Sequence, residues 1–447
     1  MTGKTPRRAA VDALLKVHKD KAYSNMVLDT FIQENAFSPQ DKALFSRLVY
    51  GCIEREMTVD YVMGKCSASS IARLHPTVRE ILRVGIYQLL YMDKIPPSAA
   101  VNEAVKLTRS MKQPYAAGLV NALLRRVDRE RETLFADLDN SVQSDAVRYS
   151  VPAHWIHLWQ DSYGEDCTKA LLPTLLEAPP QYIRVNTAKI TTVDCCQKLQ
   201  AAEIAYRHID GLTDGLEILA GFDWKRLAKI DEKWYYYQDT ASQYCVHALG
   251  AKSGEKIADV CAAPGGKSFT LAQYMQNDGH IVSGDIYPHK CEIITRRAKM
   301  LGLSCIETVT RDAATPIPPA WRGSFDRVLC DAPCSGLGVM RRKPELKYRT
   351  AADIADLPTL QLQILHEASA MVKVGGVLQY STCTLCPAEN ERVAEAFLAT
   401  HPQFVPRILP LDALFAAAGQ TPSHMLTLFP HIHRTDGFFI AGFTRRT

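Results

Sequence analysis

The feature that most constrains the fold is a series of apolar runs in the second half of the chain, each ending in polar residues. The runs KIADV, HIVSGD, SFDRVLCD and GGVLQYS carry Asp259, Asp285, Asp331 and Ser381 at or beside their ends, and helix-like segments separate them. Alternating strands and helices are typical of a doubly wound parallel sheet. Ligands of such sheets bind at the carboxyl ends of the strands. We therefore expect an α/β domain over residues 233–447 with its ligand site beside these polar residues.

The first part of the chain has a helical pattern throughout. Apolar residues recur at helical spacing, as at Val11, Leu14 and Leu15, which predicts amphipathic helices. We expect an all-α domain over residues 1–140. Between about residues 150 and 232 the pattern is mixed, with helical stretches around a strand-like YIRVNTAKI, which predicts a small α/β domain.

The composition is that of a globular protein with two or three domains. A chain of 447 residues exceeds what one core usually serves, and 47% apolar with 22% charged residues is enough to bury a sizeable core. The net charge of +4 permits a polyanionic partner without establishing one. No apolar run approaches the roughly 18–20 residues of a membrane span, and the start MTGKTPRRAAVDALLKV lacks a secretory signal. We therefore expect a cytoplasmic protein without a membrane partner, whose thirteen cysteines are reduced thiols.

Residues at the ends of the first strands favour a cofactor that contains adenosine. Gly265 and Gly266 in DVCAAPGGKSFTLAQ form a tight turn between a strand and a helix, where the backbone can approach a ligand closely. A simple strand-to-helix connection is the alternative for this turn alone. Asp285 follows about 20 residues later, where a carboxylate accepts hydrogen bonds from ribose hydroxyls. Asp312, after the third predicted strand, could meet the adenine amine, with a helix cap as its alternative role.

Two cysteine motifs follow the fourth and fifth predicted strands. Asp331 and Cys334 lie in DAPCSG, a loop constrained by Pro and Gly, and Cys383 lies in STCTLCP. Burial is the usual fate of a single cysteine, but two at the ligand edge of one sheet favour a reactive role. The Cys383-x-x-Cys386 spacing also occurs in thioredoxins and zinc sites. Its late position in the sheet and the lack of a second such pair disfavour both alternatives.

The whole motif series resembles a known family. CAAPGGK, Asp285, Asp312, DAPCSG, YSTC followed by PAENE, and the closing TDGFFIAGF are similar to the motifs of the RNA (cytosine-5) methyltransferases of the Nop2/Sun family. The N-terminal helices, including DKALFSRLVYGCIER and PPSAAVNEAVKL, resemble the NusB-like RNA-binding domain. The resemblance covers nearly the whole chain. It implies a NusB-like all-α domain at 1–140, a small α/β (RRM-like) domain at 150–232, and a Rossmann-like, S-adenosylmethionine-dependent methyltransferase domain at 233–447.

The resemblance also implies a reaction and its residues. The substrate would be a cytidine of small subunit (16S) ribosomal RNA, acted on by a monomer. C5 of cytosine is too electron-poor to accept a methyl group directly, so a thiolate must first add to C6. The resemblance gives this nucleophilic role to Cys383, release of the adduct to Cys334, and hydrogen bonding of the base to Asp331. A thiol with a pKa near 8.5 needs an environment that lowers it.

S-adenosylmethionine is the implied cofactor, and no metal is needed. The residues expected to bind it are Cys261, Ala262, Ala263, Pro264, Gly265, Gly266, Lys267, Asp285, Asp312 and Asp331. Arg341, Arg342 and Lys343, just after the DAPCSG loop, are candidates for RNA phosphate contacts, with a solvated basic run as the alternative. The position of Cys386 has no role implied by the resemblance.

Three alternatives remain open from the sequence. The substrate could be transfer RNA. It could be DNA, and then the nucleophile would be Cys334. The chain could also be a non-catalytic RNA-binding assembly factor, although the presence of both cysteines and the cofactor aspartates argues against this.

Overall fold

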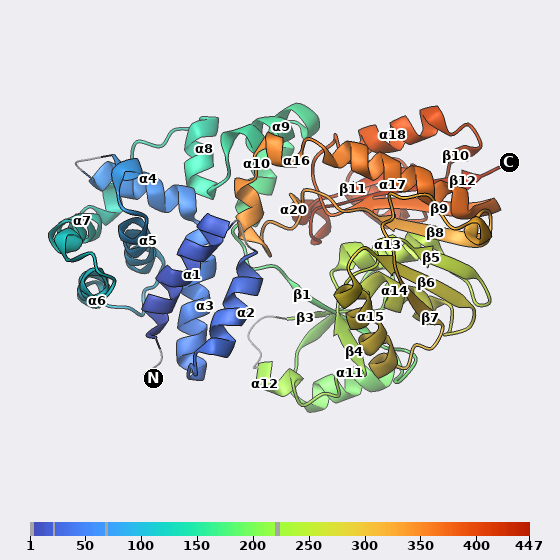
Figure 1. Ribbon diagram of the computed structural model, residues 1–447, viewed down its shortest axis with the longest axis horizontal. Helices are drawn as coiled ribbons and strands as arrows, with labels where there is room; N and C mark the ends of the chain where they lie inside the picture. The colour runs from blue at the N-terminus through green and yellow to red at the C-terminus, as the bar shows by residue number, and fades with distance from the viewer. Residues whose placement is uncertain (1–3, 21–22, 68–69, 220–223) are drawn as a thin grey trace. The chain divides into compact units, whose positions relative to one another are not determined.

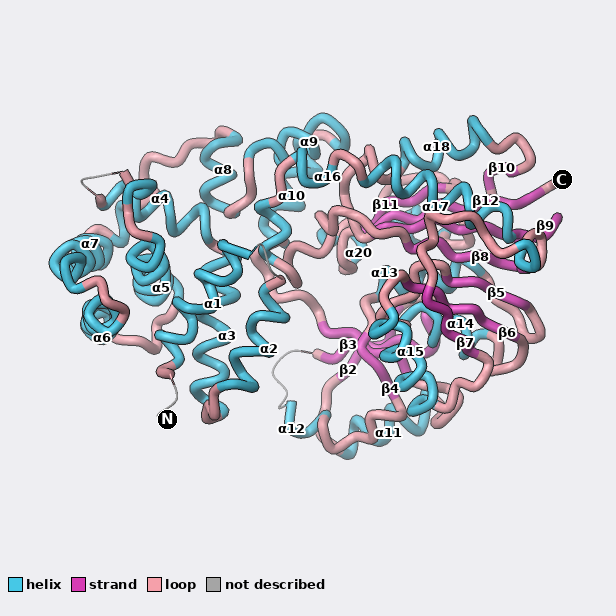
Figure 2. Tube along the Cα trace, viewed as in Figure 1, coloured by secondary structure: helices cyan, strands magenta, loops and turns pink. Residues whose placement is uncertain are grey.

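The protein folds into two compact units. The computed structural model describes residues 4–20, 23–67, 70–219 and 224–447. A helical unit contains residues 1–177 together with 340–349, and a second unit, which we call the catalytic unit, contains residues 178–339 and 350–447. Figures 1 and 2 show the helices of the first and the two sheets of the second. None of the helices in the described ranges is both long and apolar enough to cross a membrane.

The helical unit contains ten α-helices within its described residues. They are α1 (Pro6–Asp20), α2 (Ser24–Glu34), α3 (Pro39–Glu54), α4 (Glu56–Cys66), α5 (Pro76–Tyr91), α6 (Pro97–Ser110), α7 (Ala117–Arg129), α8 (Val142–Tyr149), α9 (Ala153–Tyr163) and α10 (Glu165–Thr174). Local signals fix their starts. Ser38 caps α3 by accepting a hydrogen bond from the Asp41 amide at 3.1 Å, and Pro39 follows at the first helical position, where its missing N–H costs nothing.

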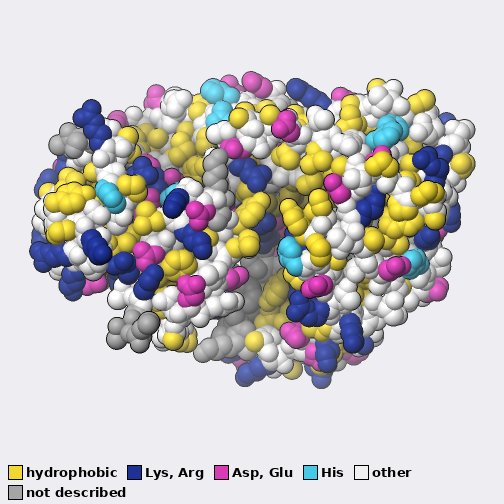
Figure 3. Space-filling view, viewed as in Figure 1, with side chains coloured by type: hydrophobic (Ala, Val, Ile, Leu, Met, Phe, Trp, Pro, Cys, Tyr) yellow, Lys and Arg dark blue, Asp and Glu magenta, His cyan; other side chains and the backbone are white. Residues whose placement is uncertain are grey.

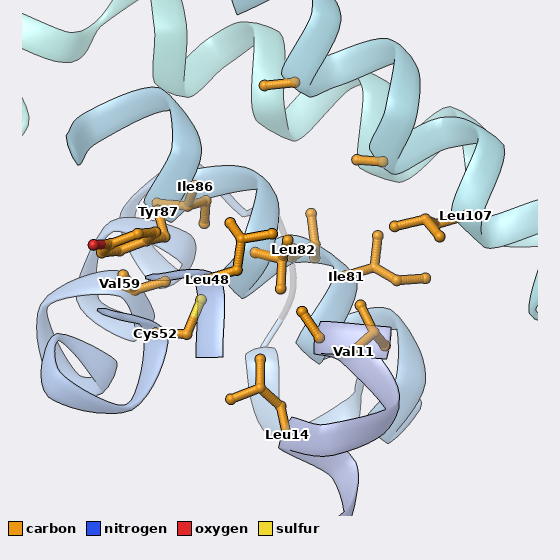
Figure 4. Close-up of a cluster of buried hydrophobic side chains, with 14 of the residues drawn as sticks. Val11, Leu14, Leu48, Cys52, Val59, Ile81, Leu82, Ile86, Tyr87 and Leu107 are labelled. Carbon is orange, nitrogen blue, oxygen red and sulfur yellow. The ribbon is translucent and has the colours of Figure 1, made fainter. Parts of the chain in front are cut away.

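The apolar faces of these helices form one core. Val11 and Leu14 of α1 lie against Leu48 of α3 and Ile81 of α5 (Figure 4), and all four are fully buried. Helix α5 is buried along most of its length, so it is the central helix of this unit. The helical faces predicted from the sequence are therefore confirmed.

A small sheet opens the catalytic unit. Its elements are β1 (Gln181–Val185), α11 (Thr192–Ala201), β2 (Tyr206–Ile209), β3 (Leu212–Ile218), α12 (Trp224–Leu227) and β4 (Tyr235–Tyr237). The strand order is β2-β3-β1-β4 with antiparallel neighbours, which is the ferredoxin-like βαββαβ arrangement. The buried Arg184 of β1 donates to Gln273 of α14 at 2.9 Å and joins this sheet to the rest of the unit.

The large sheet carries the predicted strands. Its elements are α13 (Thr240–Leu249), β5 (Lys256–Asp259), α14 (Gly266–Tyr274), β6 (His280–Asp285), α15 (Pro288–Leu301), β7 (Ile306–Thr310), β8 (Phe325–Asp331), α16 (Ala351–Ile354), α17 (Leu357–Met371), β9 (Val372–Thr382), α18 (Glu391–Thr400), β10 (Phe404–Pro406), α19 (Asp412–Ala417), β11 (Met425–Leu428), α20 (Pro430–His433) and β12 (Phe438–Arg445). The order is β10-β12-β9-β8-β5-β6-β7, and β11 pairs with β12.

Helices cover both faces of the large sheet, as expected for a doubly wound fold (Figure 1). Ile257 of β5 packs in the core that contains α13, α14 and α15, whereas its neighbour Ala258 packs in the core of α17 and α18. This alternation follows from the two-residue period of a strand.

The sheet differs from the prediction at one edge. Strands β5 to β9 are parallel, but β12 is antiparallel to β9 and pairs with both β10 and β11. The closing segment TDGFFIAGF supplies β12, which the alternating pattern did not reveal. Helix α18 begins at Glu391, the last residue of the PAENE motif.

The predicted domain boundaries at residues 140, 150 and 232 stay predictions. Helices α9 and α10 belong to the helical unit, and the ferredoxin-like and methyltransferase-type sheets share the catalytic unit. The order of β5 to β8 places the reversal of strand order between β5 and β8, which is where ligands of such sheets bind.

Candidate active site

The thiols of Cys334 and Cys383 lie together at the carboxyl ends of two adjacent parallel strands. Asp331 at the end of β8 is in register with Ser381 near the end of β9. Cys334 follows β8 by three residues, Cys383 directly follows β9, and the two sulfur atoms are 3.2 Å apart. Both side chains are partly exposed, so a substrate can reach them. The two cysteines singled out from the sequence are thus brought into one site.

Asp331 connects the cysteine loops to the glycine turn. Its Oδ1 accepts a hydrogen bond from the Ser381 hydroxyl at 2.7 Å, and its Oδ2 lies 2.6 Å from the Lys267 ammonium. Burial lowers the pKa of Lys267, but the charge and hydrogen bond of Asp331 outweigh it, and the net pKa is raised. Lys267 therefore stays charged, and its ammonium also lies 5.2 Å from the centre of the Phe438 ring.

Cys334 keeps its proton in this arrangement. The hydrogen bond with Cys383 raises the pKa of the Cys334 thiol well above its usual range, and burial adds to the rise. A protonated Cys334 can donate its S–H to the sulfur of Cys383 across the 3.2 Å contact. Either sulfur can be the donor in this contact, so the geometry allows a proton to pass between the two thiols.

A buried carboxylate holds the Cys334 loop. Glu389 is fully buried, and its Oε2 accepts hydrogen bonds from the Ser335 amide and the Gln361 side chain, both at 2.8 Å. The next residue, Asn390, donates to the Thr384 carbonyl at 3.0 Å. These two residues of the PAENE motif form the turn that delays the start of α18.

Gly338 and Gly437 connect the two cysteine loops through backbone hydrogen bonds. The Gly338 amide donates to the Cys383 carbonyl at 3.0 Å, and the Gly437 amide donates to the Gly338 carbonyl at 2.9 Å. A β-carbon on Gly338 would lie 1.9 Å from the Gly437 oxygen. Because no other residue fits between these backbones, glycine is required here.

The glycine turn has the form expected of a cofactor loop. Gly265 adopts φ +104°, and a β-carbon there would lie 2.4 Å from the Phe269 ring. Asp285 ends β6 and is largely buried, and it accepts from the Tyr287 amide at 3.1 Å. Asp312 follows β7, is exposed, and accepts from the Ala314 amide at 2.9 Å.

Two buried polar atoms near this turn have no hydrogen-bond partner. They are Asp259 Oδ1 and Gln238 Nε2, and the Gln238 amide lies 3.5 Å from where a β-carbon on Gly266 would be. Burial raises the pKa of Asp259 to about 7. Unsatisfied buried groups are costly, so a ligand with polar groups beside the turn fits these residues. Gln238 was not singled out from the sequence.

The basic residues selected from the sequence have different surroundings. Arg341 is buried, Arg342 is half-buried and Lys343 is exposed, and all three belong to the helical unit. Lys343 lies over the Tyr23 ring at 5.3 Å. Just before α1, Lys4 pairs with Asp12 at 2.9 Å, and Arg7 and Arg8 of α1 bond to the Gln88 side chain and the Ser110 carbonyl of the same unit.

Cys386 differs from Cys334 and Cys383 in its burial and in its expected reactivity. It is 4% exposed, and burial raises the pKa of its thiol to about 11. Such a thiol is protonated at neutral pH and poorly reactive. The structure thus pairs Cys383 with Cys334 and gives Cys386 the character of a buried apolar residue.

Family comparisons cover nearly the whole chain. Models of the NusB family, of the RsmF/B-like ferredoxin-like domain and of 16S rRNA methyltransferase RsmB/F match residues 4–129, 151–224 and 246–444. A probable ribosomal RNA small subunit methyltransferase B of Bacillus subtilis (strain 168) is 35% identical over 451 residues, covering 98% of each chain. The chain belongs to the ribosomal RNA small subunit methyltransferase B family. A member from Vibrio vulnificus (strain YJ016) is 33% identical and covers 97% of this chain and 98% of its own.

Solved structures share the fold of this member of the ribosomal RNA small subunit methyltransferase B family. The structure of PH0851 covers all of both chains with a TM-score of 0.81 and 23% identity. A methyltransferase homolog protein from Pyrococcus horikoshii, 26% identical, covers 69% of this chain and 100% of its own with a TM-score of 0.58. The resemblance stated from the motifs and the predicted fold class, with NusB-like, small α/β (RRM-like) and Rossmann-like parts, are confirmed, and the small α/β part matches a ferredoxin-like domain.

Several residues that shape this site were not singled out from the sequence. Glu389 and Asn390 stood in the quoted PAENE motif, and Gly437 in the closing TDGFF, but no role was inferred for them. The available signal for the first two was the run of polar residues Glu389–Glu391 a few residues after Cys383. The contact of Gly437 with Gly338 has no local signal, because the two residues are far apart in the chain.

Proposed function

We propose that this protein transfers a methyl group from S-adenosylmethionine to C5 of a cytidine in small subunit (16S) ribosomal RNA, with Cys383 as the nucleophile. The observation that carries the proposal is the pair of thiols at 3.2 Å, placed beside Asp331 at the ligand edge of the sheet. The names of the curated relatives point to the same substrate.

The two thiols have complementary tasks in the proposed reaction. The Cys383 thiolate adds to C6 of the cytosine and forms an S–C6 bond, so the electron pair of the C5–C6 double bond becomes available at C5. The bound cofactor supplies an electrophilic methyl group to C5. After loss of the C5 proton to a base, the S–C6 bond breaks and Cys383 leaves as a thiolate. Cys334, held protonated beside Cys383, can donate its proton to that leaving sulfur.

Asp331 and Lys267 lie where the base would be held. A carboxylate accepts a hydrogen bond from the exocyclic amine of cytosine, and negative charge develops on the N3 side of the ring when the thiolate adds. The Lys267 ammonium, 2.6 Å from Asp331, can stabilise that charge. Its contact with Asp331 supports a role in the base site in addition to the predicted role in the cofactor turn.

The glycine turn would hold the cofactor. Asp285 would accept hydrogen bonds from the ribose hydroxyls and Asp312 would lie near the adenine. The unsatisfied Gln238 amide beside Gly266 would donate to a carboxylate or hydroxyl of the ligand. These assignments follow the strand-end geometry of dinucleotide-type sheets.

The helical unit would bind the RNA. Exposed lysines and arginines gather on the face formed by α6 and α7 (Figure 3), where Lys106, Arg125 and Arg129 are exposed. Phosphate contacts give nucleic-acid binding most of its affinity. On this face Arg125 bonds to the neutral Asn121, whereas Lys106 and Arg129 pair with Glu103 and Glu130, as Lys4 pairs with Asp12. The assignment of Arg341, Arg342 and Lys343 to phosphate contacts, the monomeric state and the cytoplasmic location stay predictions.

Bisulfite sequencing of ribosomal RNA tests this proposal. A strain that lacks the protein should lose one C5-methylcytosine of the small subunit RNA. The wild-type chain should restore it and Cys383→Ala should not, whereas Cys386→Ala serves as a matched control in the same loop and should restore it. If the small subunit RNA is unchanged and a transfer RNA loses a C5-methylcytosine, the substrate is transfer RNA. If no RNA loses a C5-methylcytosine, the proposal is wrong.

A further inference from the structure

A cavity of about 610 Å³ lies in the catalytic unit between the small sheet and the end of the large one. Residues from β2 and β3, from α13 and from the segment of α19 and α20 line it. Its volume is typical of a site for a small organic group. None of the residues proposed for catalysis or cofactor binding lines it.

The walls of this cavity are fixed by hydrogen bonds between distant segments. The Tyr244 hydroxyl of α13 donates to the Asp210 carbonyl at 2.7 Å. The Tyr182 hydroxyl of β1 donates to the Arg434 carbonyl, and Arg434 adopts the left-handed conformation with φ +57°. Backbone held in this sparsely populated region has a cost that the surroundings must offset. The cavity is therefore a built feature of the unit.

One buried group in the wall lacks a partner. Thr240, the first residue of α13, lines the cavity and is 2% exposed, and its hydroxyl has no hydrogen-bond partner. A buried hydroxyl without a hydrogen-bond partner destabilises the folded state. Rotation about χ1 exchanges its methyl and hydroxyl groups, so the hydroxyl can turn toward an occupant.

The charges around the cavity indicate the chemistry of the occupant. Glu217 is largely buried and binds both Arg207 and Arg434, the latter at 3.1 Å, while Asp210 and Asp412 are exposed carboxylates of the lining. Three carboxylates against two arginines disfavour a bare anion. Carboxylates accept hydrogen bonds from base amino groups, whereas arginine N–H groups left over from Glu217 can still bind a phosphate.

The floor of the cavity is apolar, with Leu411, Leu414 and Ile432 in its lining. An apolar floor below polar walls suits a nucleobase, which has flat apolar faces and polar edges. A nucleotide whose base carries an exocyclic amine matches all three features: its flat faces suit the apolar residues, its amine suits the carboxylates and its phosphate suits the arginines.

The cavity is linked to the cysteine loops through the chain. Arg434 is followed closely by Gly437, whose amide binds the Gly338 carbonyl, and the Gly338 amide binds the Cys383 carbonyl. Phe438, the next residue, lies under the Lys267 ammonium. The wall of the cavity and the reactive site are therefore parts of one hydrogen-bonded segment.

We propose that this cavity binds a nucleotide of the substrate RNA that flanks the target cytidine, and that it selects a base with an exocyclic amine. The inference rests on the proposed function for the identity of the RNA. It assigns to the ferredoxin-like sheet a part in reading the RNA sequence.

The test measures RNA binding, which needs no methyl transfer. A small subunit RNA fragment that binds the wild-type protein is prepared with a single abasic residue at each position in turn. One abasic position outside the target should weaken binding about tenfold, and uridine at that position should weaken it more than cytidine, adenosine or guanosine. Thr240→Val should raise Kd roughly three- to tenfold, as expected for one lost hydrogen bond, and Thr213→Val, an exposed position of β3 outside the cavity, should not change it.

The combination of changes decides the proposal. If the cavity holds that nucleotide, Thr240→Val should weaken binding of the abasic RNA no further than the abasic residue does alone. The proposal would be overturned if the increases in Kd from Thr240→Val and from the abasic residue multiplied at every RNA position. An unchanged Kd in Thr240→Val would also overturn it. A titration with free mononucleotides, followed by NMR, distinguishes a nucleotide of the RNA from a free mononucleotide as the occupant. A mononucleotide that fills the cavity without competing with RNA would also overturn the proposal. Failure of the methyl transfer itself, with these binding results intact, would overturn only the proposed function.

Discussion

At the scale of single residues, the reactive pair depends on backbones that approach more closely than side chains allow. Gly338 and Gly437 are in direct backbone contact, and Gly338 also binds the carbonyl of Cys383. The 3.2 Å separation of the thiols thus depends on residues that carry no chemistry of their own.

Gly338→Ala should damage both stability and activity. The added β-carbon would meet the Gly437 oxygen and the Cys383 oxygen, which are backbone atoms that cannot turn away. We expect a loss of about 1–3 kcal/mol, the usual cost of overpacking, and at least a tenfold fall in kcat, measured by thermal unfolding and methyl transfer. Gly118→Ala is the control, because a β-carbon there meets nothing within 4 Å. A wild-type kcat in Gly338→Ala would show that the close contact of Gly338 with Gly437 is not needed for activity.

Motif spacing was sufficient to predict that Asp331, Cys334 and Cys383 would meet. They follow adjacent parallel strands, and the rule that such strands end at one edge brings them together. The partners of these residues could not be predicted in the same way. The contact of Lys267 with Asp331 depends on how the first turn of α14 is placed against the end of β8, and sequence patterns carry no such information.

At the scale of elements, helices α1, α4 and α5 are joined by a charged cluster. Both ring nitrogens of His18 face carboxylates, with Glu56 at 3.0 Å and Glu80 at 3.2 Å. Arg83 binds Glu80 at 3.0 Å and Asp60 at 2.6 Å. A ring with two carboxylate partners must donate from both nitrogens, so His18 is an imidazolium here.

This cluster predicts a loss of stability in mild alkali. Burial by itself lowers the pKa of His18, but Glu56 and Glu80 raise it to about 9, above the ordinary value of 6.5. Because the folded pKa is the higher one, the stabilisation is complete below pH 6.5 and is lost as the pH rises through 9. We expect the free energy of unfolding of the helical unit to fall by about 2 kcal/mol between pH 6.5 and 9, measured by denaturant titration.

His18→Gln should remove that pH dependence, whereas His280→Gln, at an exposed residue that lies 2.8 Å from the Glu307 carboxylate, should keep it. An equally steep fall in His18→Gln would assign the effect to other groups. The sequence predicted the helices of this cluster but not the cluster, since its charges come from three separate helices. It also predicted β5 to β9 but missed the antiparallel edge strands, which lack alternation with helices.

At the scale of the whole molecule, the chain crosses between its two units shortly after Cys334. Residues 340–349 belong to the helical unit, where the Lys347 ammonium donates to the Glu54 carbonyl at 3.2 Å and Tyr348 donates to Ile53 at 2.7 Å. Burial lowers the pKa of Lys347 to about 7. The sequence showed these residues only as a basic run after the DAPCSG loop, because membership of a distant unit leaves no periodic pattern.

Covalent trapping tests the central claim most directly. Each variant is incubated with S-adenosylmethionine and the RNA, and protein–RNA adducts that survive denaturing electrophoresis are counted. Cys334→Ala should accumulate the adduct because release from Cys383 is impaired, Cys383→Ala should form none, and Cys386→Ala should match the wild-type chain. An adduct in Cys383→Ala and none in Cys334→Ala would place the nucleophile at Cys334 and contradict the account.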